Sequence, residues 1–487
     1  MKVNYNFKTK PYKHQITALE RCTGKTSFGF FMEMGTGKSK VLLDDIARLY
    51  TEDQIDFALI IAPKGVYRNW TEIEIPTHFW DTIPTYLSSW QVPMSNARRQ
   101  EIRRMINATG KMKIFVINVE AFSTIKGREA GAFFGTNFGE KGLIAVDEST
   151  AIKNHKAKRT KALIKLSRLF KYKRILTGSP VTNTPMDLYS QCEFLGENML
   201  GFSSYYAFQA RYAVLQNIKM GLKSFQKIVG FRYLDELTRK LDEFSYRVLK
   251  QDCLDLPEKT FISRRIEMSK GQSDMYKKIQ KQAMIMFDNG ELVTAPAVIT
   301  QMLRLQQILS GYLNTDDGEL IEFPTQRLDA LLDICDETSG KMIIWSRFRY
   351  DIINITKQLN KTFGEGTADS FFGDTTEDKR QEVIRDFQSP TSDLRFFVGN
   401  PATAGRGLTL TEAKTVVYYT NDFNLDTRSQ SEDRCHRIGQ KNSVTYIDLI
   451  CEKTIDEKIV EALRGKINIS AQVLGENARK WLEINKT

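Results

Sequence analysis

The chain has 487 residues, about three times the length of a typical domain, so we expect two or three packed units rather than one small module. Its 41% hydrophobic and 26% charged residues exclude a disordered, collagen-like or coiled-coil chain. The 70 Lys and Arg residues exceed the 59 Asp and Glu residues and give a net charge of +11, which favours a polyanionic partner such as nucleic acid.

Short apolar runs that alternate with helical patterns indicate parallel β-sheets. A first series lies at residues 57–61, 113–117, 143–146 and 174–176, and a second at residues 342–345, 395–398, 415–419 and 444–447. Near-continuous apolar strands are typical of parallel sheets that helices cover on both faces. The sequence therefore predicts an α/β fold with two lobes, and mainly helical structure between them from about residue 190 to 325.

A glycine loop follows the first expected strand. Residues 27–34 are typical of a strand, residues 35–39 (GTGKS) of a tight loop, and a helix is expected from Val41 onward. The N–H groups of such a loop bind phosphate, while Lys38 reaches the outer phosphates and Ser39 offers a hydroxyl to Mg²⁺. Met32 stands where the strict pattern has glycine, and a chance glycine turn is the alternative for the loop taken alone.

Two adjacent carboxylates follow the buried run at residues 143–146. At the carboxyl end of a strand, Asp147 can hold Mg²⁺ directly or through water, and Glu148 can orient and deprotonate an attacking water. The alternative for an isolated acidic pair is a helix cap or a solvated turn. Together with Lys38 and Ser39, the pair favours a nucleotide hydrolase.

Two arginines near the C-terminus form a third element. Arg434 and Arg437 lie three residues apart, so on a helix they share a face and can point at one phosphate group. Two guanidinium groups from a separate lobe would neutralise the charge of a transferred γ-phosphate. The alternative is surface ion pairing with Glu432 and Asp433.

Taken in order, these segments resemble the motifs of superfamily-two helicase-like ATPases, and specifically those of the Swi/Snf (Snf-two) family of DNA translocases. The resembling segments are residues 12–15 (Q motif), 32–39 (P-loop), 62–66 with 69–70 (motif Ia), 147–154 (DESTAIKN, similar to a DEAH box), 176–180 (motif III), 341–348 (motif IV), 403–410 (motif V) and 432–440 (EDRCHRIGQ, motif VI). Ser149 and Thr150 in the acidic box, and Arg406 and Thr409 in motif V, depart from the family pattern.

The resemblance implies two RecA-like lobes with parallel β-sheets and helical protrusions between them. Residues 1–250 would form the first lobe, with a helical protrusion from about residue 190. Residues 251–325 would form a connector and a helical protrusion, and residues 326–487 the second lobe with C-terminal helices.

The resemblance also implies ATP and Mg²⁺ as cofactors, and it assigns roles to individual residues. The catalytic residues are Lys38, Asp147, Glu148, Arg434 and Arg437, and the Mg²⁺ ligands are Ser39 and Asp147. The ATP-binding residues are Gln15, Gly35, Thr36, Gly37, Lys38, Ser39, Gly405 and Gly407. Thr177, Ser179 and Gln430 couple the sites, and Lys64, Ser346, Arg347, Thr403 and Thr409 contact DNA.

The implied function is a DNA-stimulated ATPase that translocates on double-stranded DNA without sequence specificity and remodels or displaces bound protein. The alternatives are a strand-separating DNA or RNA helicase of the same superfamily and a non-catalytic nucleic-acid clamp. The expected partners are double-stranded DNA and a DNA-bound protein, with no membrane and no required oligomer.

Residues 151–174 carry ten basic residues and no acidic one. This segment is either a face that follows DNA phosphates or a solvated helix, and the sequence leaves both alternatives open.

The six cysteines are scattered without a C-x-x-C pair, which argues against a zinc site and favours a reducing compartment. The sequence also lacks a signal-like N-terminus and a run of about 18 apolar residues. We therefore expect a protein that is not secreted: cytoplasmic if its source is prokaryotic or viral, and nuclear if it is eukaryotic.

Overall fold

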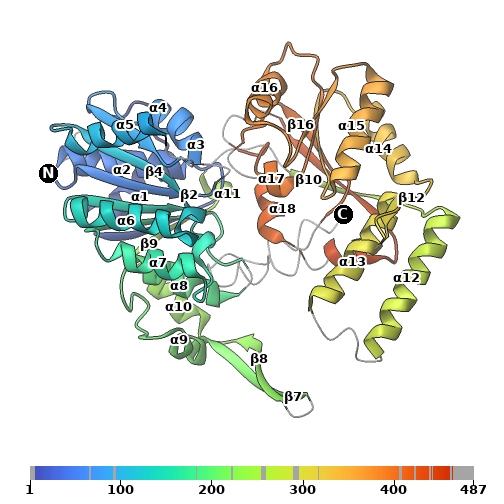
Figure 1. The fold of residues 1–487 in the computed structure, drawn as a ribbon, viewed down its shortest axis with the longest axis horizontal. Helices are drawn as coiled ribbons and strands as arrows, with labels where there is room; N and C mark the ends of the chain where they lie inside the picture. The colour runs from blue at the N-terminus through green and yellow to red at the C-terminus, as the bar shows by residue number, and fades with distance from the viewer. Residues whose placement is uncertain are drawn as a thin grey trace. The chain divides into compact units, whose positions relative to one another are not determined.

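The computed structural model describes residues 6–460 and 463, except for residues 65–66, 92–94, 183, 221–222, 254–258, 289–294, 316, 405–407, 422–423, 438–439 and 441. The chain divides between Asp255 and Leu256 into two compact units, each of which is described by itself (Figure 1). In the described part of the chain, none of the helices combines the length and the apolar character needed to cross a bilayer.

Unit 1 is built on a sheet of seven parallel strands in the order β3-β4-β2-β5-β6-β1-β9. The strands are β1 (Ser27–Met32), β2 (Phe57–Ala62), β3 (Thr85–Ser89), β4 (Met112–Asn118), β5 (Gly142–Asp147), β6 (Tyr172–Leu176) and β9 (Ser245–Val248). Because parallel strands all end at the same edge, the segments that follow β5, β6 and β1 are neighbours there, with the β6 segment in the middle.

Side chains of the strands alternate between two apolar cores, one on each face of this sheet. Ala58 and Ile60 of β2 face the core that includes helices α1 and α2, whereas Leu59 and Ile61 face the core that includes α6, α7 and α8. The longer helices are α1 (Lys13–Cys22), α2 (Lys38–Thr51), α5 (Asn96–Asn107), α6 (Ile125–Phe138), α7 (Lys158–Ser167), α8 (Leu188–Leu195), α9 (Tyr205–Tyr212) and α10 (Leu234–Asp242). The short ones are α3 (Tyr67–Asn69), α4 (Ile75–His78), α11 (Lys250–Cys253), a π-helix at Trp70–Glu74, and 3₁₀ turns at Val119–Ser123, Ser149–Ile152 and Pro185–Asp187.

An antiparallel hairpin lies where the sequence analysis expected helices. Strands β7 (Ala213–Met220) and β8 (Lys223–Phe231) pair between α9 and α10, and Figure 1 shows the hairpin extending away from both. Its apolar residues mix with Gln, Asn, Ser and Lys. This composition lacks the continuous apolar run that marked the sheet strands, and for this reason the hairpin was missed.

Unit 2 is built on a sheet of six parallel strands in the order β10-β17-β16-β13-β15-β14. The strands are β10 (Lys259–Ile266), β13 (Lys341–Trp345), β14 (Ala368–Phe371), β15 (Phe396–Gly399), β16 (Ala413–Tyr418) and β17 (Val444–Cys451), with a small hairpin of β11 (Tyr312–Asn314) and β12 (Leu320–Glu322). The helices are α12 (Lys270–Asp288), α13 (Ala295–Ser310), α14 (Gln326–Glu337), α15 (Arg349–Phe363), α16 (Glu377–Gln388), α17 (Pro401–Ala404) and α18 (Leu425–Glu432).

The prediction of an α/β fold with two parallel sheets is confirmed, because each apolar run of the sequence lies in a strand of one or the other sheet. Four sheet strands were not predicted: β3, β9, β10 and β14. Strand β10 lies within residues 251–325, the segment expected to connect the lobes, yet it pairs with β17 over its whole length. The sheet of unit 2 thus includes residues that precede α12 and α13.

Candidate active site

The glycine loop of unit 1 joins β1 to the start of α2. Gly35 and Gly37 have φ angles of +79° and +88°, which only glycine adopts readily. Lys38 and Ser39 are the first two residues of α2, and no side chain of the described residues caps this helix end. The first N–H groups of α2 are therefore free of a side-chain acceptor and can bind an anionic ligand.

Helix α1 holds the loop through one carbonyl oxygen. The Gln15 amide nitrogen donates to the Thr36 carbonyl at 2.9 Å, and the His14 ring, protonated at Nε2, donates to the same oxygen at 2.8 Å. A Cβ atom at Gly37 would lie 2.1 Å from the Gln15 amide nitrogen. Gln15, predicted to bind ATP, is thus seen to brace the loop, and its contact with ATP stays a prediction.

The start of the loop is braced from a distant part of unit 1. The Thr36 hydroxyl donates to the Glu33 carbonyl at 2.7 Å, and the Glu33 carboxylate accepts from the backbone N–H of Lys250 at 2.7 Å. Hydrogen bonds from α1 and from Lys250 therefore both hold the first part of the loop.

Asp147 ends β5 and lies almost fully buried, at 6% exposure. Its Oδ2 accepts a hydrogen bond from the Trp70 indole at 2.9 Å, and its Oδ1 accepts one from the backbone N–H of Glu148 at 3.0 Å. Burial, followed by the neighbouring charge of Glu148, raises the pKa of Asp147 to about 7, while Lys38 and the Trp70 hydrogen bond act in the opposite direction. The structure therefore brings Lys38, Asp147 and Glu148 into one electrostatic cluster.

Glu148 adopts a left-handed backbone conformation, with φ +50° and ψ +60°. For a residue with a side chain this conformation costs on the order of 1–2 kcal/mol, and such residues concentrate at functional sites. The turn directs the chain from β5 into the 3₁₀ turn at Ser149–Ile152 and leaves the Glu148 side chain half-buried.

The segment after β6 lies between the loop and the acidic pair. Thr177 is buried, its N–H donates to the Phe30 carbonyl of β1 at 3.2 Å, and its hydroxyl accepts from the N–H of Ser179. Arg247 of β9 donates to the carbonyls of Gly178 and Phe31 at 2.6 Å and 3.2 Å. The coupling role of Thr177 and Ser179 stays a prediction, and the third predicted coupling residue, Gln430, lies half-buried in α18 of unit 2.

The donor set of unit 1 fits Mg²⁺. Ser39 offers a hydroxyl and Asp147 a carboxylate, which are the hard oxygen ligands that Mg²⁺ prefers together with substrate phosphates and water. Among the residues that the structure describes, no group of three or more His, Cys, Asp or Glu side chains forms a dedicated metal cage.

The two arginines of motif VI do not lie on a helix, and this part of the prediction is wrong. Helix α18 ends at Glu432, and residues 433–437 form turns and bends. The guanidinium groups nevertheless meet, because Nη1 of Arg434 and Nη1 of Arg437 both donate to the Leu408 carbonyl, at 3.1 Å and 3.2 Å. Gly405 and Gly407 of motif V, predicted to bind ATP, lie outside the described residues.

The predicted DNA-contacting residues differ in exposure. The side chain of Lys64 is exposed at the end of β2, while those of Arg347, Thr403 and Thr409 are half-buried in unit 2. Arg347 also donates to the Gln306 side chain at 3.3 Å.

Ser346 requires a correction. Its side chain is fully buried, its hydroxyl donates to Asp351 Oδ2 at 2.7 Å, and it lies 2.9 Å from the Thr420 hydroxyl. A side chain held inside unit 2 in this way is not presented to a DNA phosphate, because every such contact requires access from solvent.

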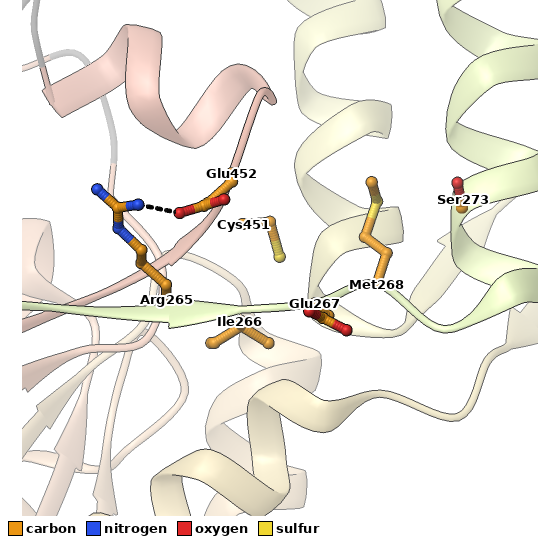
Figure 2. A pocket seen from close by; sticks show the side chains of 7 residues that line it. All are labelled: Arg265, Ile266, Glu267, Met268, Ser273, Cys451 and Glu452. Carbon is orange, nitrogen blue, oxygen red and sulfur yellow. Dashed lines mark hydrogen bonds and ion pairs between the residues drawn. The ribbon is translucent and has the colours of Figure 1, made fainter.

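A pocket of about 400 Å³ lies elsewhere in unit 2, where β10 leads into α12 beside the end of β17. Figure 2 shows the Arg265–Glu452 ion pair at one side of it and Met268 and Ser273 toward the helices. None of the predicted site residues lines this pocket, so we assign it no role.

Three residues of unit 1 were not assigned a role from the sequence: Trp70, Gln191 and Arg247. Trp70 lies in the segment that resembles motif Ia, and Gln191 is a polar residue in the otherwise mostly apolar helix α8. The available signal in the sequence was a glutamine within a mostly apolar helix, since a polar side chain that is buried needs hydrogen-bond partners.

Family profiles and known proteins match most of this chain. The profile of the SNF2-related domain matches residues 19–313, more than half of the chain, and the profile of the helicase conserved C-terminal domain matches residues 325–439. The chain is 25% identical to "Probable ATP-dependent DNA helicase CHR12" of Arabidopsis thaliana over 91% of its own length, and 26% identical to "ATP-dependent helicase brm" of Drosophila melanogaster over 68%.

The chain spans only 39% and 21% of the length of these two relatives. A solved structure, the Sulfolobus solfataricus SWI2/SNF2 ATPase core in complex with dsDNA, is similar over 99% of this chain and 98% of that one, with 22% identity and a TM-score of 0.43.

Proposed function

The chain belongs to the SNF2-related family, and from this premise we propose that it is a DNA-stimulated ATPase that translocates on double-stranded DNA and displaces or remodels bound protein. The observation that carries the proposal is the cluster at the edge of the unit 1 sheet, where Lys38 begins α2 and the Asp147–Glu148 pair ends β5. A phosphate-binding loop beside an acidic pair is the arrangement that phosphoryl transfer to water requires.

Each residue of this cluster has one task in the proposed reaction. The N–H groups of the loop and the Lys38 ammonium bind the phosphates, and Glu148 accepts the proton of the attacking water. The Trp70 indole and the Glu148 N–H fix the orientation of the Asp147 carboxylate. Mg²⁺, when bound by Ser39 and Asp147, supplies positive charge to the phosphate oxygens.

Arg434 and Arg437 of unit 2 have the task of stabilising charge on the transferred phosphate. Their guanidinium groups already share one acceptor, the Leu408 carbonyl. A phosphate oxygen is a stronger acceptor than a carbonyl, because both partners of the hydrogen bond are then charged. The proposed cycle has ATP binding draw the two units together and hydrolysis release them.

The DNA contact proposed for Lys64, Arg347, Thr403 and Thr409 is to backbone phosphates. Cations, hydroxyls and N–H groups bind phosphates without reading base edges, so translocation would be independent of sequence. The net charge of +11 supports a polyanionic partner.

The test is ATP hydrolysis measured in parallel with duplex DNA, single-stranded DNA and RNA. The proposal predicts the strongest stimulation by duplex DNA, and no hydrolysis by a Glu148→Gln variant that still binds ATP. A triplex-forming strand should be displaced during hydrolysis, whereas a strand of the duplex itself should stay paired. Release of the paired strand would instead favour the strand-separating helicase, and a wild-type chain without hydrolysis would favour a clamp.

A further inference from the structure

One buried amide joins the acidic box to the segment after β6. Gln191 of α8 is 0% exposed, and so is Ser149. The Gln191 Oε1 accepts a hydrogen bond from the Ser149 hydroxyl at 2.7 Å, and its Nε2 donates to the carbonyls of Pro180 at 2.7 Å and Asp187 at 2.8 Å. Both amide hydrogens and one amide lone pair are therefore used within unit 1.

The two segments that Gln191 joins carry residues to which we assign roles in the proposed hydrolysis. Ser149 directly follows Glu148, whose backbone is held in the left-handed conformation. Pro180 ends the segment that contains Thr177 and Ser179, the predicted coupling residues of unit 1. The Gln191 amide is thus hydrogen-bonded to both segments, at 2.7 Å in each case.

A second set of hydrogen bonds strengthens the same connection. The Asp187 carboxylate accepts hydrogen bonds from the Thr182 N–H at 3.1 Å and the Thr182 hydroxyl at 2.9 Å. The Ser190 hydroxyl donates to the Lys153 carbonyl at 3.2 Å, and the Lys153 ammonium lies 3.8 Å from Asp187. The first turn of α8 and the residue before it therefore hold both segments.

The sequence departs from the resembled DEAH box at the residue that makes this bond. Ser149 stands at the alanine position of that box, and an alanine side chain has no hydroxyl to donate. We propose that Gln191 is a positioning residue which, through Ser149 and Pro180, links the acidic pair to the β6 segment, so that DNA binding changes the placement of Glu148. This inference rests on the proposed function.

The experiment compares Ser149→Ala, Gln191→Leu and the double variant, each as the full chain. The readout is the ratio of hydrolysis with saturating duplex DNA to hydrolysis without DNA, together with the KM for ATP and the thermal midpoint. We expect a ratio about tenfold lower in either single variant, and a double variant no lower than Gln191→Leu, because both changes break the same connection. The KM for ATP should stay within about twofold, because neither side chain contacts the loop.

The control is Cys192→Ala, a substitution of the next residue of α8, whose side chain lies in the apolar core. It should lower the thermal midpoint and leave the ratio at the wild-type value. Ser149→Ala leaves Gln191 Oε1 buried without a donor, so the double variant should be more stable than the sum of the single changes predicts.

Two results are contrary to the inference, and they are distinguishable. In the first, DNA stimulates the wild-type chain, and the variants are less stable but keep the wild-type ratio of hydrolysis with DNA to hydrolysis without DNA. Gln191 would then have a purely structural role, which overturns the inference but not the proposed function. A wild-type chain that DNA does not stimulate overturns the proposed function and the inference with it. If Gln191→Leu does not fold, Ser149→Ala decides by the same ratio.

Discussion

At the scale of single residues, Gly37 is a position of the nucleotide loop that has no room for a side chain. It combines a φ of +88° with a Cβ position only 2.1 Å from the Gln15 amide nitrogen. Gly37→Ala should therefore displace Gln15 and break its bond to the Thr36 carbonyl. We expect ATP affinity to fall at least about tenfold, as measured by equilibrium binding of a fluorescent ATP analogue.

Gly24→Ala is the matched control for this change. Gly24 also has a positive φ, of +78°, but a Cβ atom there would meet nothing within 4 Å. Both variants should be roughly 1 kcal/mol less stable because of the strained backbone, and only Gly37→Ala should bind the nucleotide more weakly. Equal affinities in the two variants would contradict the role assigned to the contact with Gln15.

Asp351 provides a residue-scale prediction of pH dependence. Its carboxyl group is fully buried in unit 2 and accepts hydrogen bonds from Ser346 and Ser310. Burial raises its pKa to about 7, although Ser346 and Arg327 act in the opposite direction. The native state thus keeps a proton that the unfolded state releases near pH 4, so the contribution of Asp351 to the stability of unit 2 should be complete below pH 4 and be lost as the pH rises to about 7.

Asp351→Asn removes the titration and keeps an acceptor for both serines. Between pH 5 and pH 7.5 the stability of the wild type should fall by on the order of 2 kcal/mol more than that of this variant. The measurement is the urea dependence of hydrogen exchange in β13, which reports the opening of unit 2. Asp147 in unit 1 also has a raised pKa, but it is common to both proteins and cancels in the comparison.

The residues of the site were predictable where the backbone segment itself carries the chemistry. A glycine loop before a helix and two carboxylates after a buried strand are local patterns, and the structure has both. Arg434, Arg437 and Ser346 depended instead on tertiary packing. The spacing of residues along the chain predicts neither the carbonyl group that the two arginines share nor the burial of Ser346.

At the scale of elements, α7 is the part of the basic segment in which several lysines lie on one exposed face. Lys158, Lys161 and Lys165 lie on one face of this helix, are exposed, and have no ion pair among the described residues. Replacing all three with alanine should weaken duplex DNA binding. The slope of log affinity against log salt should fall by about 0.9 for each DNA phosphate that the variant no longer binds, as measured by fluorescence anisotropy.

Lys277, Lys278 and Lys281 of α12 form the control set, because they are exposed and their removal changes the net charge by the same amount. If DNA follows α7, only the α7 variant changes the salt slope substantially. Equal slopes of log affinity against log salt in the two triple variants would show that the α7 face is solvated and does not contact DNA.

Most sheet strands were predictable because central parallel strands are apolar on both faces. Strand β2, for example, is buried at every position, whereas β10 is exposed at six of its eight positions and was missed. The β7–β8 hairpin was missed for a related reason, because β7 and β8 pair only with each other and are not buried inside a larger sheet. Periodicity therefore located the cores of both units better than their edges.

At the scale of the whole molecule, the chain has two units of related construction, each with a parallel sheet and with predicted functional segments after its strands. The order of motifs along the sequence was enough to predict this duplication. The proposed reaction uses residues of both units: Lys38, Asp147 and Glu148 of unit 1, and Arg434 and Arg437 of unit 2. The proposed mechanism therefore depends on whether unit 2 takes part in chemistry at the loop of unit 1.

Hydrolysis of ATP by an Arg437→Ala variant at saturating duplex DNA decides this question, and ATP affinity is measured in the same variant. The control is Arg385→Ala, which removes an exposed arginine of unit 2. We predict that kcat falls about a thousandfold in Arg437→Ala, with ATP affinity within a few-fold of wild type and an unaffected control. Wild-type hydrolysis by Arg437→Ala would refute the mechanism, because the loop of unit 1 would then act without this arginine.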